Sequence, residues 1–222
     1  MSKQLQLLNK KVIHCTACPR LIEHCRTVAT IKRKAYKDHN YWGHPVPGFG
    51  DPQARLLIVG LAPGAHGANR TGRMFTGDRS GDFLFAAMHA TGFANQSLCS
   101  DPSDGLELID AYITNAARCA PPDNKPLPEE LTRCQPFLLE EIKVLKNIKL
   151  VLCLGRIALD AYAKSQQLSK CNFAHGLWID APTKVLCSYH PSQQNTQTGR
   201  LTMPMFEDIF FQARQYCASP KP

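Results

Sequence analysis

Many of the side chains that could take part in catalysis or binding in this 222-residue chain lie in one glycine-rich segment, residues 60–78. It follows the apolar run 56–59 and precedes the apolar run 83–88, a pattern typical of a buried strand, a loop and a helix. Such loops leave backbone N–H groups free for an anion and let a ligand approach the main chain closely. A loop built only to turn does not need the side chains found here, which are His66, Arg70, Arg73, Phe75 and Asp78.

Further polar side chains follow other apolar runs. Asn115, Arg156 and His190 each stand at or just beyond the end of such a run. Because the C-terminal ends of parallel strands share one edge of a sheet, where ligands bind, we expect these residues and the glycine-rich loop to meet at one rim. The residues alone also allow purely structural roles, since Asn115 could cap a loop and His190 could be a structural histidine before the turn-forming Pro191.

Four of the ten cysteines form two pairs. Cys15 and Cys18 are a C-x2-C pair, and Cys119 and Cys134 flank a proline-containing segment with 14 residues between them. Four thiolates are the ligand set of a structural zinc ion or of an iron–sulfur cluster, and the wide second pair favours the cluster only slightly.

The positioning elements follow from the apolar runs. Strands are expected at Leu56–Val59, Ala111–Thr114, Leu150–Leu154 and Val185–Ser188, and helices near 81–91, 128–147, 156–167 and 203–216. Strands that alternate with helices favour a parallel sheet covered on both faces. We predict a single α/β domain over residues 1–222, with a central four-stranded, mainly parallel sheet and a basic N-terminal segment (1–40) that carries the first cysteine pair.

The charge distribution indicates a class of partner. The net charge is +8, and residues 1–37 hold nine Lys and Arg against the single acid Glu23, so the whole excess lies there. Clustered cations suit a nucleic acid, although a solvated basic arm would look the same. No apolar run is long enough for a membrane span, and the first residues do not resemble a signal peptide, so we expect a cytoplasmic protein.

Two extended motifs resemble the signature motifs of the uracil-DNA glycosylase superfamily. They are the segments 60–67 (GLAPGAHG) and 190–196 (HPSQQNT), and in these forms they are similar to family 5, the B-type enzymes. The cysteine set Cys15, Cys18, Cys119 and Cys134 matches the [4Fe–4S] ligands of families 4 and 5, which favours the cluster over zinc. The resemblance runs from about Cys15 to about Phe210 and implies the uracil-DNA glycosylase-like fold.

The resemblance implies hydrolysis of the N-glycosidic bond of a damaged base flipped into a pocket. Gly60 and Ala62 would shape that pocket, Phe75 would stack on the base and Asn115 would read its edge. His190 would donate to the base carbonyl oxygen as charge develops there. His66 would either line the pocket or brace the loop.

The catalytic carboxylate departs from the superfamily pattern. Several members place an acidic or amide side chain in the first motif, where this chain has the apolar Leu61 and Ala62. Asp78 is the remaining acid of the loop, and it could stabilise the positive sugar or orient water while also capping the next helix. A single carboxylate fits a broad substrate range, and no lysine lies beside the motifs, so we expect a monofunctional glycosylase without lyase activity.

The implied partner is duplex DNA with deaminated bases (uracil, hypoxanthine and xanthine), with single-stranded DNA as a further candidate. Residues 193–201 would enter the duplex, the basic N-terminal segment would extend the DNA track, and the cluster would hold loops in place. We expect a monomer. The predicted DNA-contacting residues are Arg70, Arg73, Ser192, Gln193 and Arg200. Two rival functions are a non-catalytic iron–sulfur DNA-binding protein and a small-molecule nucleotide-binding enzyme.

Overall fold

A computed structural model describes residues 3–219; the outermost residues of the predicted domain, 1–2 and 220–222, lie outside this part. The chain forms one six-stranded sheet with strand order β1-β3-β2-β4-β6-β5. The bounds are β1 Phe49–Gly50, β2 Leu56–Gly60, β3 Ala111–Asn115, β4 Leu150–Leu154, β5 Trp178–Ile179 and β6 Lys184–Ser188.

The predicted parallel core is confirmed, and the strand number is corrected. Strands β3, β2, β4 and β6 run parallel to their neighbours, and they are the four predicted from apolar runs. The edge strands β1 and β5 pair antiparallel with β3 and β6. Each edge strand has only two residues, too short a segment to leave a periodic signal in the sequence.

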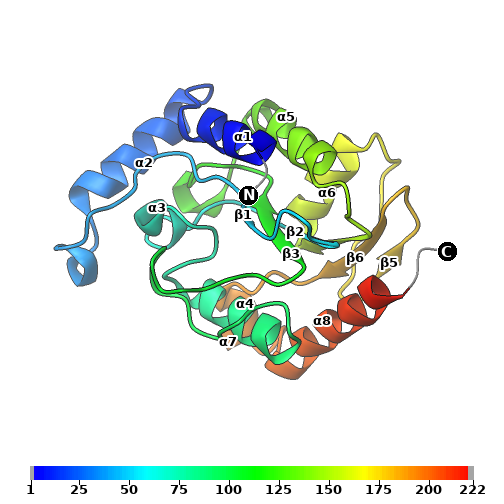
Figure 1. Cartoon of the computed structure of the whole chain (residues 1–222). Coiled ribbons are helices and arrows are strands. Elements are labelled where there is room, and N and C mark those ends of the chain that lie inside the picture. The colour runs from blue at the N-terminus through cyan, green and yellow to red at the C-terminus, as the bar shows by residue number, and fades with distance from the viewer. Residues whose placement is uncertain (1–2, 220–222) are drawn as a thin grey trace.

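The larger helices cover both faces of the sheet (Figure 1), with α1 (Lys3–Ile13), α5 (Pro128–Val144) and α6 (Arg156–Ser165) on one side. Helices α4 (Arg79–Ala90) and α8 (Met203–Ala218) cover the other side. Strand residues alternate between two apolar cores, so that Leu57 and Val59 belong to the first side while Leu56 and Ile58 belong to the second.

The N-terminal segment is more ordered than a basic arm. It forms α1 and α2 (Pro19–Ile31), and α2 extends beyond the sheet at the left of Figure 1. Three-residue helices η1 (Lys34–Tyr36) and η2 (Pro122–Asn124) and the short helices α3 (Ala68–Thr71) and α7 (Gln193–Gln197) complete the described chain. None of the helices in residues 3–219 is long and apolar enough to cross a membrane.

Candidate active site

A pocket of about 790 Å³ lies at the C-terminal edge of the parallel strands. Its walls come from the loops that follow β2, β4 and β6, from residues 123–125 and from Arg33. The strand-end expectation is therefore correct for most of the predicted residues. Those that line the pocket are Ala62, His66, Phe75, Asp78, His190, Ser192 and Gln193.

Phe75 forms an aromatic wall of this pocket. Its ring centroid lies 5.9 Å from that of His190, with the planes inclined by 30°. Its backbone adopts a φ of 53°, which non-glycine residues rarely do and which marks local strain. Its carbonyl oxygen accepts a hydrogen bond from Cys99 Sγ at 3.3 Å, and it lies so close to Gly81 that a Cβ there would overlap it. These contacts hold the strained backbone and thereby fix the ring.

Gly60 and Asn115 lie behind the Phe75 ring, paired directly across β2 and β3. A Cβ on Gly60 would overlap Asn115 Oδ1 and lie 2.8 Å from Phe75 Cζ, so glycine is needed there. Asn115 is 1% exposed, and its Nδ2 donates to Met74 Sδ at 2.8 Å. Its Oδ1 has no hydrogen-bond partner among the described residues. A buried polar atom without a hydrogen-bond partner destabilises the fold. Its presence here is explained if a bound ligand supplies the missing hydrogen bond.

Asp78 caps a helix and also lines the pocket. Its Oδ1 accepts the Gly81 N–H at 3.0 Å, which caps helix α4. Its Oδ2 lies against Gly64 and Gly67, where a Cβ on Gly64 would come within 2.7 Å and a Cβ on Gly67 would overlap it. Burial raises the pKa of Asp78, and backbone hydrogen bonds from Gly81 and Ser80 oppose that rise. The carboxylate is thus held at the pocket wall by backbone on both sides.

His190 follows β6 after one intervening residue. Burial lowers its pKa to about 4, so the imidazole is neutral near pH 7 and carries one N–H donor. No described residue hydrogen-bonds to its ring, although Asn195 Nδ2 donates to its backbone oxygen at 2.8 Å. Asn195 belongs to the second motif but was not predicted as a site residue; it secures the strand end that presents His190.

His66 does both things that were expected of it as alternatives. It lines the pocket, and its Nδ1 lies 3.0 Å from Tyr41 Oη, which braces the loop against the segment after α2. Burial is the main reason that its pKa is lowered, and the nearby Arg33 and Arg70 add to the effect.

The phosphate contacts predicted for Arg70 and Arg73 are wrong. Both side chains are buried and committed to the protein. Arg70 donates to the backbone oxygens of His66 and Gly77 at 2.8 and 2.7 Å. Arg73 donates to both carboxylate oxygens of Asp104 at 2.9 and 2.6 Å, and although burial alone would raise the pKa of Asp104, these bonds help to hold it at about 2. The two arginines fix the loop and leave no guanidinium for DNA.

Other cations surround the pocket instead. Arg33, Arg79, Lys125 and Arg156 line it with exposed side chains, although Arg156 also pairs with Asp160 at 2.9 Å. Arg156 was expected at this rim, but none of the four was predicted to contact DNA. The sequence offered a signal for two of them, because Arg79 follows Asp78 directly and Arg156 follows a strand end.

The loop expected to enter DNA is polar at its tip. Ser192 caps α7 by accepting the Asn195 N–H, and Gln193 is exposed. Leu201 is fully buried, so the exposed part of the loop offers amides rather than an apolar wedge. Arg200 is exposed and rests over the Tyr189 ring, 4.5 Å from its centroid.

The four predicted ligand cysteines lie near one another where α2 meets the start of α5. Cys18, Cys119 and Cys134 are buried and Cys15 is partly exposed. Burial raises the pKa of Cys134 to about 11, with the nearby thiols of Cys18 and Cys15 adding to the rise, and its Sγ accepts the Arg118 N–H at 3.4 Å. Within residues 3–219, no three His, Cys, Asp or Glu side chains are already arranged as a metal-ion site.

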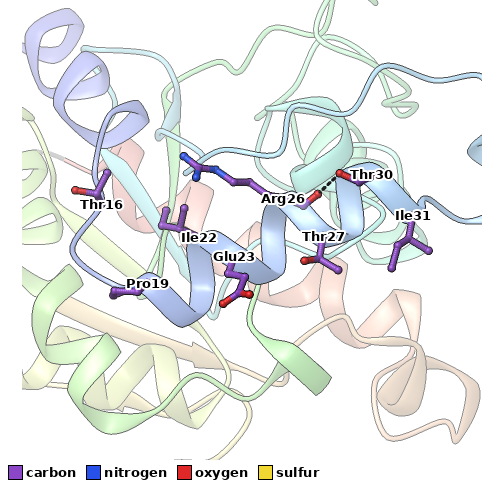
Figure 2. A pocket seen from close by; sticks show the side chains of 8 residues that line it. All are labelled: Thr16, Pro19, Ile22, Glu23, Arg26, Thr27, Thr30 and Ile31. Atoms are coloured by element: carbon purple, nitrogen blue, oxygen red, sulfur yellow. Dashed lines mark hydrogen bonds between the residues drawn. The ribbon is translucent and has the colours of Figure 1, made fainter.

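A second hollow, of about 590 Å³, runs along the outer face of α2 (Figure 2). Its two charged side chains, Glu23 and Arg26, point away from each other, and its other lining residues are Thr, Ile and Pro. No set of groups converges there, so the strand-end pocket is the better active site.

Comparisons with known proteins agree with this geometry. Residues 47–214 match the model of the uracil DNA glycosylase superfamily. The chain is 47% identical over 214 residues to a type-5 uracil-DNA glycosylase of Mycobacterium leprae, covering 94% of this chain and 93% of that protein. It is 48% identical over 205 residues to a type-5 uracil-DNA glycosylase of Thermus thermophilus, covering 90% and 93%. It is 28% identical over 209 residues to a type-4 uracil-DNA glycosylase of Thermotoga maritima, covering 92% and 91%. On this match and these identities, the chain belongs to the uracil-DNA glycosylase superfamily, in its type-5 branch.

Proposed function

We propose that this uracil-DNA glycosylase flips uracil, hypoxanthine and xanthine out of DNA and hydrolyses their N-glycosidic bonds, leaving abasic sites. The observation that carries the proposal is one strand-end pocket walled by Phe75, Asp78 and His190, with the unpaired Asn115 Oδ1 behind it. The enzyme would work in the cytoplasm as a monomer.

Each of these groups has a distinct role in the proposed reaction. The flipped base stacks on Phe75, and Asn115 Oδ1, the unpaired atom of its amide, accepts a hydrogen bond from the edge of the base. As the bond between C1′ and the base nitrogen breaks, its electron pair leaves with the base. Neutral His190 donates a hydrogen bond to the base oxygen, where this negative charge gathers. Asp78 stabilises the positive charge on the sugar, and water then gives hydroxide to C1′ and a proton to the base.

The lining beside Asp78 supports a broad substrate range. Leu61 and Ala62 line the pocket, and both are apolar where a water-positioning group would otherwise stand. Little on that wall would therefore restrict the pocket to uracil.

Lys125 could in principle form a Schiff base with the sugar and so give a lyase step in addition to hydrolysis. It lines the pocket, which the sequence did not foresee, but its side chain is exposed to water rather than desolvated as a Schiff-base lysine usually is. We therefore still propose a monofunctional glycosylase without lyase activity. Borohydride should trap no covalent enzyme–DNA adduct; a trapped adduct that disappears in Lys125→Ala would show a lyase step.

We infer that the DNA track follows the exposed cations. Arg33, Arg79, Lys125 and Arg156 surround the pocket, and Arg200 lies on the neighbouring loop. The basic N-terminal residues, which hold the whole charge excess, would extend this track. Duplex DNA is the proposed main substrate, and single-stranded DNA a second one.

The cysteine group fits a [4Fe–4S] cluster held by Cys15, Cys18, Cys119 and Cys134. Cys15 and Cys18 come from the segment between α1 and α2, and their thiols interact with those of Cys119, after β3, and Cys134, on α5. The Arg118 N–H donates to Cys134 Sγ, as hydrogen bonds to cluster ligands do. When bound, the cluster would cross-link these segments and so hold the DNA-facing loops. A brown protein with absorbance near ~400 nm supports this; a colourless protein with one zinc ion contradicts it.

A panel of duplex and single-stranded oligonucleotides, each with one deaminated base, tests the proposed activity directly. We expect abasic sites from uracil, hypoxanthine and xanthine. Cleavage of uracil alone would contradict the broad range. Binding without base release would favour a non-catalytic DNA-binding protein.

A further inference from the structure

The residues that hold the strand end beneath His190 come from a distant segment, residues 173–177. This segment packs along β6, where the Gly176 N–H donates to the Cys187 oxygen at 2.8 Å and the Cys187 N–H donates to the Leu177 oxygen at 2.9 Å. His175 lies in its middle and is partly buried. It is absent from both sequence motifs, and it does not line the pocket.

His175 contacts two consecutive residues that lead into His190. Its Nδ1 accepts the Tyr189 N–H at 3.3 Å and lies 3.4 Å from Ser188 Oγ. Its ring also stacks on the Tyr189 ring, with centroids 5.1 Å apart and planes inclined by 25°. One imidazole thus fixes both the backbone and the side chain of the residue next to His190.

The protonation state of His175 suits this contact. An acceptor at Nδ1 requires the neutral imidazole. Burial lowers the pKa of His175, while its bond to the Met205 backbone and the charge of Asp208, both on α8, act in the opposite direction. The ring therefore bridges β6 and α8 in its neutral form.

The other hydrogen bonds at the strand end leave the Tyr189 N–H to His175, and one of them is the bond from Asn195 Nδ2 to the His190 oxygen. Ser188 Oγ donates to the Tyr189 oxygen at 3.0 Å, and the Gly155 N–H donates to the Ser188 oxygen at 2.8 Å. Within residues 3–219, the acceptor for the Tyr189 N–H is His175. The His190 ring, by contrast, has no hydrogen bond to a described residue, so its direction depends on the backbone that carries it.

We propose that His175 is a positioning residue for catalysis, which aims the His190 imidazole at the departing base through the Tyr189 N–H. This inference rests on the proposed role of His190 as the donor to that base. A shift of about 1 Å in a catalytic group can cost on the order of 100-fold in rate, so loss of this hydrogen bond is large enough to measure.

Three variants separate the hydrogen bond from simple packing. In His175→Asn the amide Oδ1 takes the place of Nδ1 and keeps the acceptor. In His175→Phe the stacked ring stays and the acceptor is removed, and in His175→Gln the polar group is moved toward the Nε2 position. His89→Phe removes an exposed histidine on α4 and is the matched control.

The measurement is single-turnover excision of uracil at saturating enzyme, together with the Kd for DNA. We expect His175→Phe and His175→Gln to slow excision by about 10- to 100-fold with little change in Kd. His175→Asn should stay within about threefold of the parent, and His89→Phe should match it. In a His190→Ala background, His175→Phe should cause no further loss.

Several results would overturn this role. His175→Phe as fast as His175→Asn would show that the acceptor is irrelevant, and an equal loss in the His190→Ala background would show that His175 does not act through His190. If both the Phe and Gln variants fail to fold, His175 is structural only. Full activity of His190→Ala alone would instead refute the proposed role of His190 as donor to the base, whereas loss of base release from every oligonucleotide by the parent enzyme would refute the proposed function.

Discussion

Gly67 and the carboxylate of Asp78 are packed so closely that a single added Cβ on Gly67 would overlap Asp78 Oδ2. The other oxygen of Asp78 is bonded to the Gly81 N–H, so the carboxylate has no free direction in which to retreat. Gly67, the last residue of the first motif, therefore leaves the space that the Asp78 carboxylate occupies, eleven residues further along the chain.

We predict that Gly67→Ala slows uracil excision by about 100-fold, because it displaces a carboxylate that stabilises transition-state charge. In an Asp78→Ala background the overlap is gone, so Gly67→Ala should add almost no further loss. Single-turnover rates of the two single variants and the double variant measure this. If the rate loss of the double variant equals the product of the two single losses, Gly67 does not act through Asp78.

The pKa of His190 predicts how stability depends on pH. Its folded pKa of about 4 lies below the unfolded value of about 6.5, so the unfolded chain binds the proton first as the pH falls. The wild type should thus lose up to about 3 kcal/mol of stability from this group between pH 6.5 and pH 4. Urea unfolding across that range should show a smaller loss for His190→Gln; equal slopes would contradict the assignment.

A buried ion pair links the cysteine group to the base pocket. Arg118, 1% exposed, donates to Glu141, 0% exposed, through both terminal nitrogens, and Thr114 Oγ1 donates to Glu141 Oε2 at 2.6 Å. Arg118 precedes Cys119, and Thr114 precedes Asn115. Removing one partner leaves a buried charge unpaired, which is strongly destabilising.

We therefore expect Arg118→Met to lower the free energy of unfolding by about 3–5 kcal/mol. The matched control is Arg156→Met, which breaks the exposed pair with Asp160 and should cost less than about 1 kcal/mol. Chemical denaturation of both variants checks this. Equal effects would show that burial does not decide the cost.

The exposed cations and the buried arginines should differ in their salt dependence. Removing one cation that neutralises a DNA phosphate makes the slope of log K against log salt shallower by about one unit. Arg79→Ala should weaken DNA binding and reduce this slope, whereas Arg73→Ala should lower stability by breaking the Asp104 pair and leave the slope unchanged. Fluorescence anisotropy at several salt concentrations measures both. A reduced slope in Arg73→Ala would show that Arg73 contacts a DNA phosphate after all.

The features that could be predicted from the sequence are those that a local pattern of apolar residues determines, namely the four parallel strands and the site at their ends. The runs around Ile58, Ile113, Leu152 and Leu186 give strands because each is apolar on both faces, and the strand-end rule then brings His190 and the glycine-rich loop together.

Other features depend on long-range contacts that no local pattern shows. Arg73 looks available for phosphate until the fold brings Asp104 to it, 31 residues along the chain. His175 and Lys125 gain their places only through packing against β6 and at the pocket edge. The α1 and α2 helices were missed because the basic residues of this segment were interpreted as a solvated arm, although Leu5 and Leu8 lie at helical spacing and are buried, as is Leu21.

The most direct test of the whole account is single-turnover uracil excision by Asp78→Asn. Asparagine still caps α4 as well as aspartate does, so folding should be preserved while the negative charge is removed. We predict a loss of about 100-fold or more with DNA binding intact, because the sugar charge then has no carboxylate to stabilise it. A rate within twofold of the parent would contradict it.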